Sequence, residues 1–148
     1  MSLVITDDAN LKLVDQAVAA GGPFHAVNAE LFTNVGLSPT SDNVYSDLTP
    51  PLFAGYAKTP VIWSAPVVQP DSSYSVLGQN IVNVMTATGE PCAITGYALT
   101  SGVSVVVLEA LEVFATPINI ALPGDFCAFV PQFQIPSDGN FGSGTQVG

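Results

Sequence analysis

The feature that most restricts the fold is a succession of short apolar segments with alternating side chains. Residues 24–34 place successive side chains on opposite faces, as in a β-strand. Further strands are expected at about residues 58–67, 72–86, 91–99, 103–115, 118–122 and 125–135. Gly, Pro, Asp and Ser separate them, Thr116–Pro117 being one predicted turn. The pattern predicts an all-β chain, an antiparallel sandwich or a jelly-roll-like barrel.

Residues 1–22 break this pattern and predict a short amphipathic helix over about residues 9–20. Acidic residues suit its first turn, and a Gly pair suits its end. Leu11, Val14 and Val18 recur at spacings of three and four, which gives one narrow apolar stripe. Because such a stripe must pack on something, we expect it to contact its own domain or a neighbouring subunit.

The chain of 148 residues suits a single globular domain. We expect an N-terminal arm with a short helix over residues 1–22, a β domain over 23–135 and a flexible tail over 136–148. The tail is rich in Gly and Ser and has one aromatic residue, Phe141. Phe141 is therefore a candidate contact with a neighbour, although simple disorder of the tail is the alternative.

Charged residues make up only 9% of the chain, and the formal net charge is −10. Lys12 and Lys58 are the only cations, and there is no Arg. Binding to nucleic acid or to anionic lipid rests on Lys and Arg, so neither is expected. A surface with so few charges also predicts that partners cover much of it.

Neither a membrane span nor a secretion signal is predicted. The longest apolar run falls far short of the ~18 residues that a membrane helix needs. The first residues lack the basic region with which a secretion signal begins.

No catalytic machinery is predicted, so we do not expect an enzyme. His25 is the only histidine, and no nucleophile motif accompanies it. Glu109 and Glu112 are the one close carboxylate pair outside the N-terminal region. Residues three apart on a strand point to opposite faces, so the pair shares a ligand only if a bulge intervenes.

No cofactor or metal is predicted either. Cys92 and Cys127 lie in apolar stretches, where two buried free thiols are expected unless their strands are neighbours and form a disulfide. Asp42 and Asp47 share a polar loop but lack the ligand spacing of a calcium-binding loop.

Most aromatic residues fall on apolar strands and are expected in the core. Tyr45 and Tyr74 lie in polar surroundings instead. Since Tyr is frequent in binding surfaces, these two residues are candidate partner contacts, together with Leu11, Val14 and Val18.

One ordered set of motifs resembles a known group of proteins. The set spans residues 31–135 and comprises Leu31-Phe32-x-Asn34, Leu48-Thr49, Phe53-x-Gly55-Tyr56-Ala57, Trp63, Ile94-x-Gly96-Tyr97, Glu112-x-Phe114, Pro117 and Gly124-Asp125. It resembles small virion proteins of tailed bacteriophages, of the capsid decoration or cement type. The helix-like residues 1–22 depart from that group.

The resemblance implies a structural virion protein that binds the outer capsid surface and stabilises the shell. It implies the major capsid protein as partner, a homotrimer at three-fold junctions, and synthesis in the host cytoplasm. It carries over no catalytic residue. The alternative is a host-recognition module from a tail or fibre, which would bind surface glycans through loops such as residues 36–47.

Overall fold

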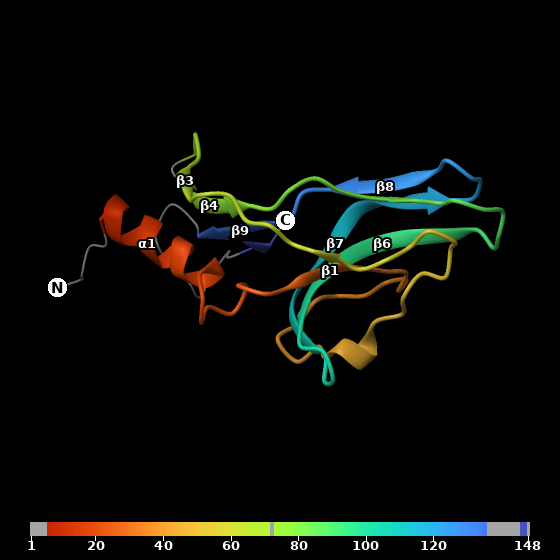
Figure 1. The fold of residues 1–148 in the computed structure, drawn as a ribbon, viewed down its shortest axis with the longest axis horizontal. Coiled ribbons are helices and arrows are strands. Elements are labelled where there is room, and N and C mark those ends of the chain that lie inside the picture. Colours follow the sequence, from red (N-terminus) through yellow and green to blue (C-terminus); the bar gives the residue numbers. More distant parts are fainter. Residues whose placement is uncertain (1–5, 72, 136–145, 148) are drawn as a thin grey trace.

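The computed structural model describes residues 6–71, 73–135 and 146–147, and it is mostly antiparallel β-sheet with one α-helix (Figure 1). The elements in chain order are α1 (Asp7–Val18), β1 (Asn28–Phe32), the 3-10 helix η1 (Tyr45–Asp47), β2 (Thr59–Pro60), β3 (Val67–Val68), β4 (Tyr74–Leu77), β5 (Ile81–Val84), β6 (Cys92–Ser101), β7 (Val107–Ile120), β8 (Phe126–Phe129), β9 (Gln132–Ile135) and β10 (Gln146–Val147). The predicted all-β character is therefore confirmed.

The sheet with the longest strands has the order β2-β1-β6-β7, and all its pairs are antiparallel. We call it the large sheet. Leu31 lies opposite Tyr97, and Tyr97 lies opposite Glu112. Because side chains alternate across a strand, Leu31 and Tyr97 share one face with Ala29 and Leu99, and all four are buried. This face of the sheet covers the core.

Two smaller sheets complete the fold. One has the order β10-β9-β4-β3, and the other is the pair β5-β8. Gly78 and Pro131 mark the points where the chain passes from one small sheet to the other, and the Gly78 N–H donates to the Pro131 carbonyl at 2.7 Å. A Cβ on Gly78 would approach a methyl group of Val61 to 2.8 Å, which explains glycine at this crossing.

The main core gathers buried side chains from the large sheet and from the β5-β8 pair. Ile81 and Cys127 enter it from the pair, and Ile94 and Leu99 enter it from the large sheet. The Tyr97 ring stacks on the Phe129 ring with centroids 4.5 Å apart. These contacts fix the inner face of β5 and β8, so the outer face of the pair is left at the surface.

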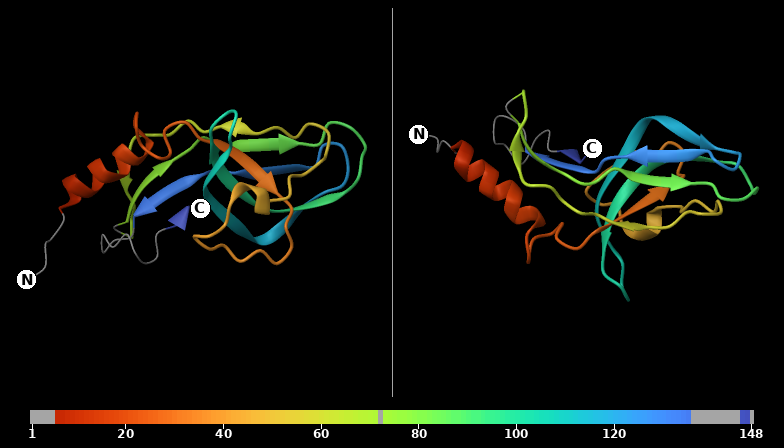
Figure 2. Two further views of the ribbon diagram at one scale, coloured as in Figure 1. Left: turned by 90° about the horizontal axis from the view of Figure 1, so that it is seen from below. Right: turned by 45° about the horizontal axis from the view of Figure 1, so that its top comes forward.

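Helix α1 packs on its own chain, against β4 and β9 (Figure 2). Thr6 caps its start by accepting a hydrogen bond from the Ala9 N–H. Val14 is fully buried with Tyr74 and Val76, and Leu11 packs at the border of this cluster. The apolar stripe of α1 therefore packs on the chain's own domain, which is one of the two partners expected for it.

Several predicted boundaries are wrong. Residues 103–122 were expected as two strands with a turn at Thr116–Pro117, but β7 runs from Val107 to Ile120 and continues through that turn. There the β6–β7 register shifts, since Ile118 pairs with Ile94 while Val113 pairs with Gly96. The turn residues thus bend an edge strand, where Pro is tolerated, instead of ending it.

The strands expected at residues 72–86 and 125–135 are each two strands. The first divides into β4 and β5, and the second into β8 and β9, at the crossing of Gly78 and Pro131. The strand expected at residues 24–34 is confirmed only over the five residues of β1. The tail expected over 136–148 lies outside the described residues except for β10.

Candidate functional site

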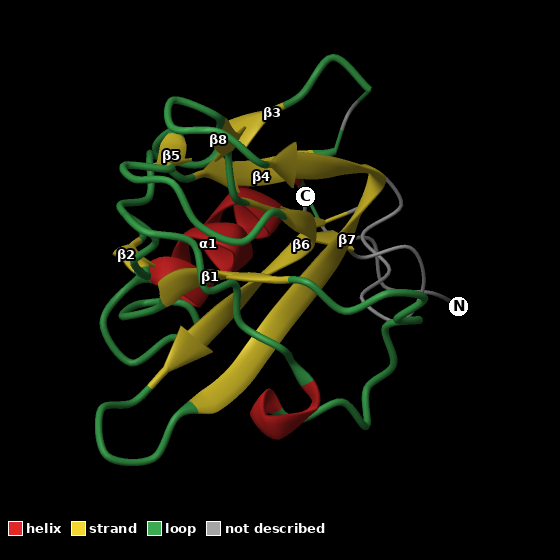
Figure 3. Cartoon of the chain, turned by 90° about the vertical axis from the view of Figure 1, so that its right-hand side faces the viewer, coloured by secondary structure: helices red, strands yellow, loops and turns green. Residues whose placement is uncertain are grey.

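A long loop between β1 and β2 passes beside β7 and carries η1 (Figure 3). Asn34 closes the loop at its base, because its amide donates to the Asp47 carbonyl and its Oδ1 accepts from the Thr49 N–H, both at 2.8 Å. Tyr45 ties the middle of the loop to the sheet by donating to Glu30 Oε1 at 2.9 Å. The loop is therefore held in place by Asn34 and Glu30, which belong to the strand expected at residues 24–34, and by Tyr45 of the loop itself.

A groove of about 660 Å³ lies between this loop and β7. Its lining residues are Pro39, Thr40, Ser41 and Asn43 of the loop and the consecutive residues 108–113 of β7. Because β7 is the last strand in the order of its sheet, the groove follows a sheet edge. An elongated ligand can therefore contact both the strand and the loop.

A bulge in β7 brings Glu109 and Glu112 to the same face. Leu108 pairs with Thr100, whereas Ala110 pairs with Leu99, so Glu109 is the extra residue. Glu109 Oε1 accepts a 2.6 Å hydrogen bond from Ser101 Oγ, and Glu112 lies opposite Tyr97. The expectation that Glu109 and Glu112 point to opposite faces is therefore wrong, because a bulge interrupts the regular strand pattern here.

Glu112 is held in an unfavourable environment for a charge. Its Oε2 and the Tyr97 hydroxyl are both buried, and neither has a hydrogen-bond partner of good geometry among the described residues. Burial raises the pKa of the Glu112 carboxyl, while the nearby Tyr97 hydroxyl opposes this shift. Burial and the charge of Glu112 together raise the pKa of Tyr97. At this end of the groove the Tyr97 hydroxyl is the donor beside the Glu112 carboxyl, but its geometry leaves Oε2 without a full hydrogen bond.

The outer surface of the β5-β8 pair is apolar. Val82 lies opposite Ala128 and Val84 lies opposite Phe126, and all four side chains are exposed, Phe126 to 57%. Together with the exposed Val130 they form what we call the β5-β8 apolar face. No charged residue lies within β5 or β8. A face of this kind is usually covered by a partner.

The predicted contact residues do not gather at one place. Val14 is buried in the α1 cluster, where Leu11 and Val18 pack as half-buried neighbours. Tyr45 is half-buried over Glu30. Phe141 lies outside the described residues.

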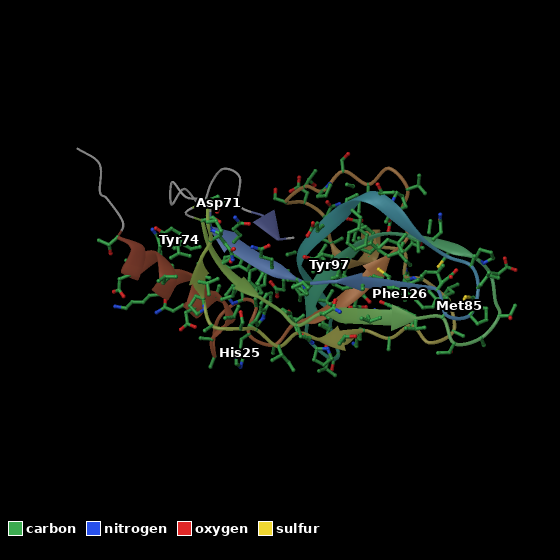
Figure 4. All side chains as sticks on the ribbon, turned by 90° about the horizontal axis from the view of Figure 1, so that it is seen from above. His25, Asp71, Tyr74, Met85, Tyr97 and Phe126 are labelled. Carbon is green, nitrogen blue, oxygen red and sulfur yellow. The ribbon has the colours of Figure 1, made fainter. Side chains whose placement is uncertain are left out.

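The expectation that Tyr74 lies at the surface is wrong. Its side chain is only 4% exposed and packs beneath α1, whereas Phe126 lies in the half of the molecule far from the helix (Figure 4). The polar residues around Tyr74 in the sequence are themselves buried, as Ser73 and Ser75 show. Gln134 donates a hydrogen bond to the Ser73 hydroxyl, and Gln69 donates one to the Ser75 hydroxyl. The polar neighbours of Tyr74 therefore did not indicate that Tyr74 is exposed.

Other candidate groups have structural partners. His25 Nδ1 lies 3.1 Å from the Val18 carbonyl at the end of α1. Cys92 and Cys127 are free thiols, and burial raises the pKa of Cys127 to about 11. Within the described ranges, no group of acidic, His and Cys side chains is arranged to hold a metal ion.

The residues of the β5-β8 apolar face were missed by sequence reasoning. Their alternation predicted strands, but period two alone does not indicate which side of a strand is covered.

In the part of the chain that the structure describes, no helix is long and apolar enough to cross a membrane. Comparisons with family models, curated proteins and solved structures found no match.

Proposed function

We propose that this chain is a structural virion protein of the capsid decoration or cement type. It would bind the major capsid protein on the outer capsid surface and stabilise the shell by adding contacts between neighbours. The observation that carries this proposal is the β5-β8 apolar face, an uncharged surface with an exposed Phe126 in a chain of net charge −10. Its role is binding, not catalysis.

Contact through this face is favourable on physical grounds. Complete burial of a large apolar side chain contributes about 1.5–3 kcal/mol, and Phe126, Val82 and Val84 each retain roughly half of that surface for a partner. The face carries no charge, so acidic copies can meet there without bringing carboxylates together. Many copies on one shell would add avidity to a modest single contact.

We also propose that the large sheet stacks on the β5-β8 pair as in a β-sandwich. The core cluster between them would make the pair a rigid platform, and a rigid surface loses little entropy on binding. We also propose a homotrimer, in which cyclic symmetry lets each copy donate the same two patches.

The first measurement is the solution mass of the purified protein, followed by its binding to emptied or expanded capsids of the virus that encodes it. A trimer that binds capsids and raises their melting temperature supports the proposal. The variant Val84→Asp should weaken both properties, since it places a charge in the apolar face.

Val35→Asp is the matched control, because Val35 is 93% exposed in the loop after β1 and outside the face. Equal losses in both variants would contradict the role of the face. A monomer that ignores capsids and binds host cells or glycans would favour a recognition module.

A further inference from the structure

The outer edge of β7 is open. The hydrogen-bonded order of the large sheet ends at β7, and within residues 6–71, 73–135 and 146–147 no strand pairs with that edge. An edge of this kind presents N–H and C=O groups to any extended chain that approaches. β7 has 14 residues, so the edge is long enough for a further strand.

The edge is also enclosed along one stretch. Residues 108–113 of β7 line the groove of about 660 Å³, and loop residues Thr40, Ser41 and Asn43 form the facing wall. An extended segment in the groove would pair with β7 through its backbone and contact the loop with its side chains. This is the arrangement by which a peptide adds a strand to a sheet.

The two carboxylates of the groove have another plausible explanation, since charged residues on an edge often prevent aggregation. A protective charge is expected in water, however, and Glu112 Oε2 is buried without a hydrogen-bond partner. The Tyr97 hydroxyl lies beside this carboxyl and interacts with it, but without the geometry of a full hydrogen bond. Burial of unpaired polar atoms is costly, so a donor from a ligand would relieve the cost.

We propose that the β7 edge binds an extended segment of another protein and that a Lys or Arg of this segment faces Glu112. The proposal deepens the proposed function and rests on it only in taking a neighbouring protein of the shell as the source of the segment.

A second copy is a poor occupant, because Lys12 and Lys58 are its only cations. Lys12 lies in α1 and pairs with Asp8 at 2.9 Å. The acidic groove therefore favours a basic partner.

The test uses the full chain and a fluorescent, end-blocked ten-residue peptide in which Lys alternates with Val and Thr. A matched peptide has Glu in place of Lys, and a third is N-methylated on alternate residues. Fluorescence anisotropy should give binding of the Lys peptide, no binding of the Glu peptide, and about tenfold weaker binding after N-methylation, because methylation removes backbone donors.

The variant Glu112→Gln should weaken binding of the Lys peptide about tenfold, which is the expected loss for a hydrogen bond to a charged group. Glu90→Gln is the control, since it removes the same charge at an exposed residue outside the groove. Amide chemical shifts should change in residues 107–114 and 40–43. A thermal melt checks that both variants fold.

The proposal is overturned if the two variants lose affinity equally, if N-methylation has no effect, or if the shift changes fall outside these residues. Binding of the peptide is measured without capsids, so its failure is distinct from failure of the proposed function. The Val84→Asp variant, which should lose assembly, should keep the affinity of the wild type for the peptide.

Discussion

Gly96→Ala is expected to destabilise the protein strongly, because Gly96 lies where β6, β7 and Phe32 meet. A Cβ at this position would lie under 3.0 Å from both the Glu112 carbonyl oxygen and the Phe32 ring. The carbonyl belongs to the paired strand β7, and the Phe32 side chain is fully buried. Neither can retreat without disturbing the strand pairing or the core.

The magnitude follows from these contacts. Overpacking of a well-packed site costs about 1–3 kcal/mol. Disturbance of a backbone hydrogen bond beside it adds about 1 kcal/mol. The smaller entropy loss of Ala relative to Gly returns about 0.5–1 kcal/mol. We therefore expect a loss of about 1–3.5 kcal/mol in the free energy of unfolding.

Thermal and urea unfolding followed by circular dichroism measure this loss. For a chain of this length, it corresponds to a fall of roughly 2–14 °C in Tm. Gly89→Ala is the matched control, since a Cβ there would lie 3.6 Å from the Met85 methyl, an ordinary contact. A Gly96→Ala protein as stable as the Gly89→Ala protein would refute the packing described for β6 and β7.

Three further predictions concern single side chains. Burial raises the pKa of Glu112 above its ordinary 4.5, so its stabilising contribution is complete below pH 4.5 and is lost as the pH rises through the folded pKa. Glu112→Gln should therefore raise Tm more at pH 7 than at pH 4. The Ala121 and Leu122 N–H groups lower the pKa of Asp125 below 3.8, so this carboxylate stabilises the fold above pH 3.8 and ceases to do so as the pH falls through the folded pKa. Asp125→Asn should lower Tm at pH 7, with the difference from wild type vanishing in acid. Val14→Ala should cost about 1–3 kcal/mol and speed hydrogen exchange in α1 more than in β6, since Val14 is buried only in the α1 cluster.

Alternation predicted where the chain is extended, but not which strands share a sheet. Residues 72–86 read as one strand because nothing local distinguishes β4 from β5, and their separation depends on Gly78 meeting Pro131 from a distant segment. The helix was predicted well, since its acidic first turn, its terminal Gly pair and its apolar stripe are local signals. Its observed bounds, Asp7–Val18, begin and end two residues before the expected ones.

The site was less predictable than the fold. Whether Glu109 and Glu112 share a face depends on one extra residue in the β6–β7 ladder, which no local pattern indicates. Exposure of Phe126 and burial of Tyr74 depend on which face of a strand another element covers. These are tertiary properties, so a period of two in the sequence leaves them open.

Because the chain has so few cations, cleavage by trypsin can measure the local unfolding of α1. Trypsin cleaves after Lys and Arg, so only two bonds of the chain are open to it, after Lys12 and after Lys58. The first lies within α1, on the turn that Val14 anchors, and the second lies in the extended stretch before β2. A helix must unfold locally before a protease cleaves it, so the rate of nicking after Lys12 measures how often α1 leaves β4 and β9.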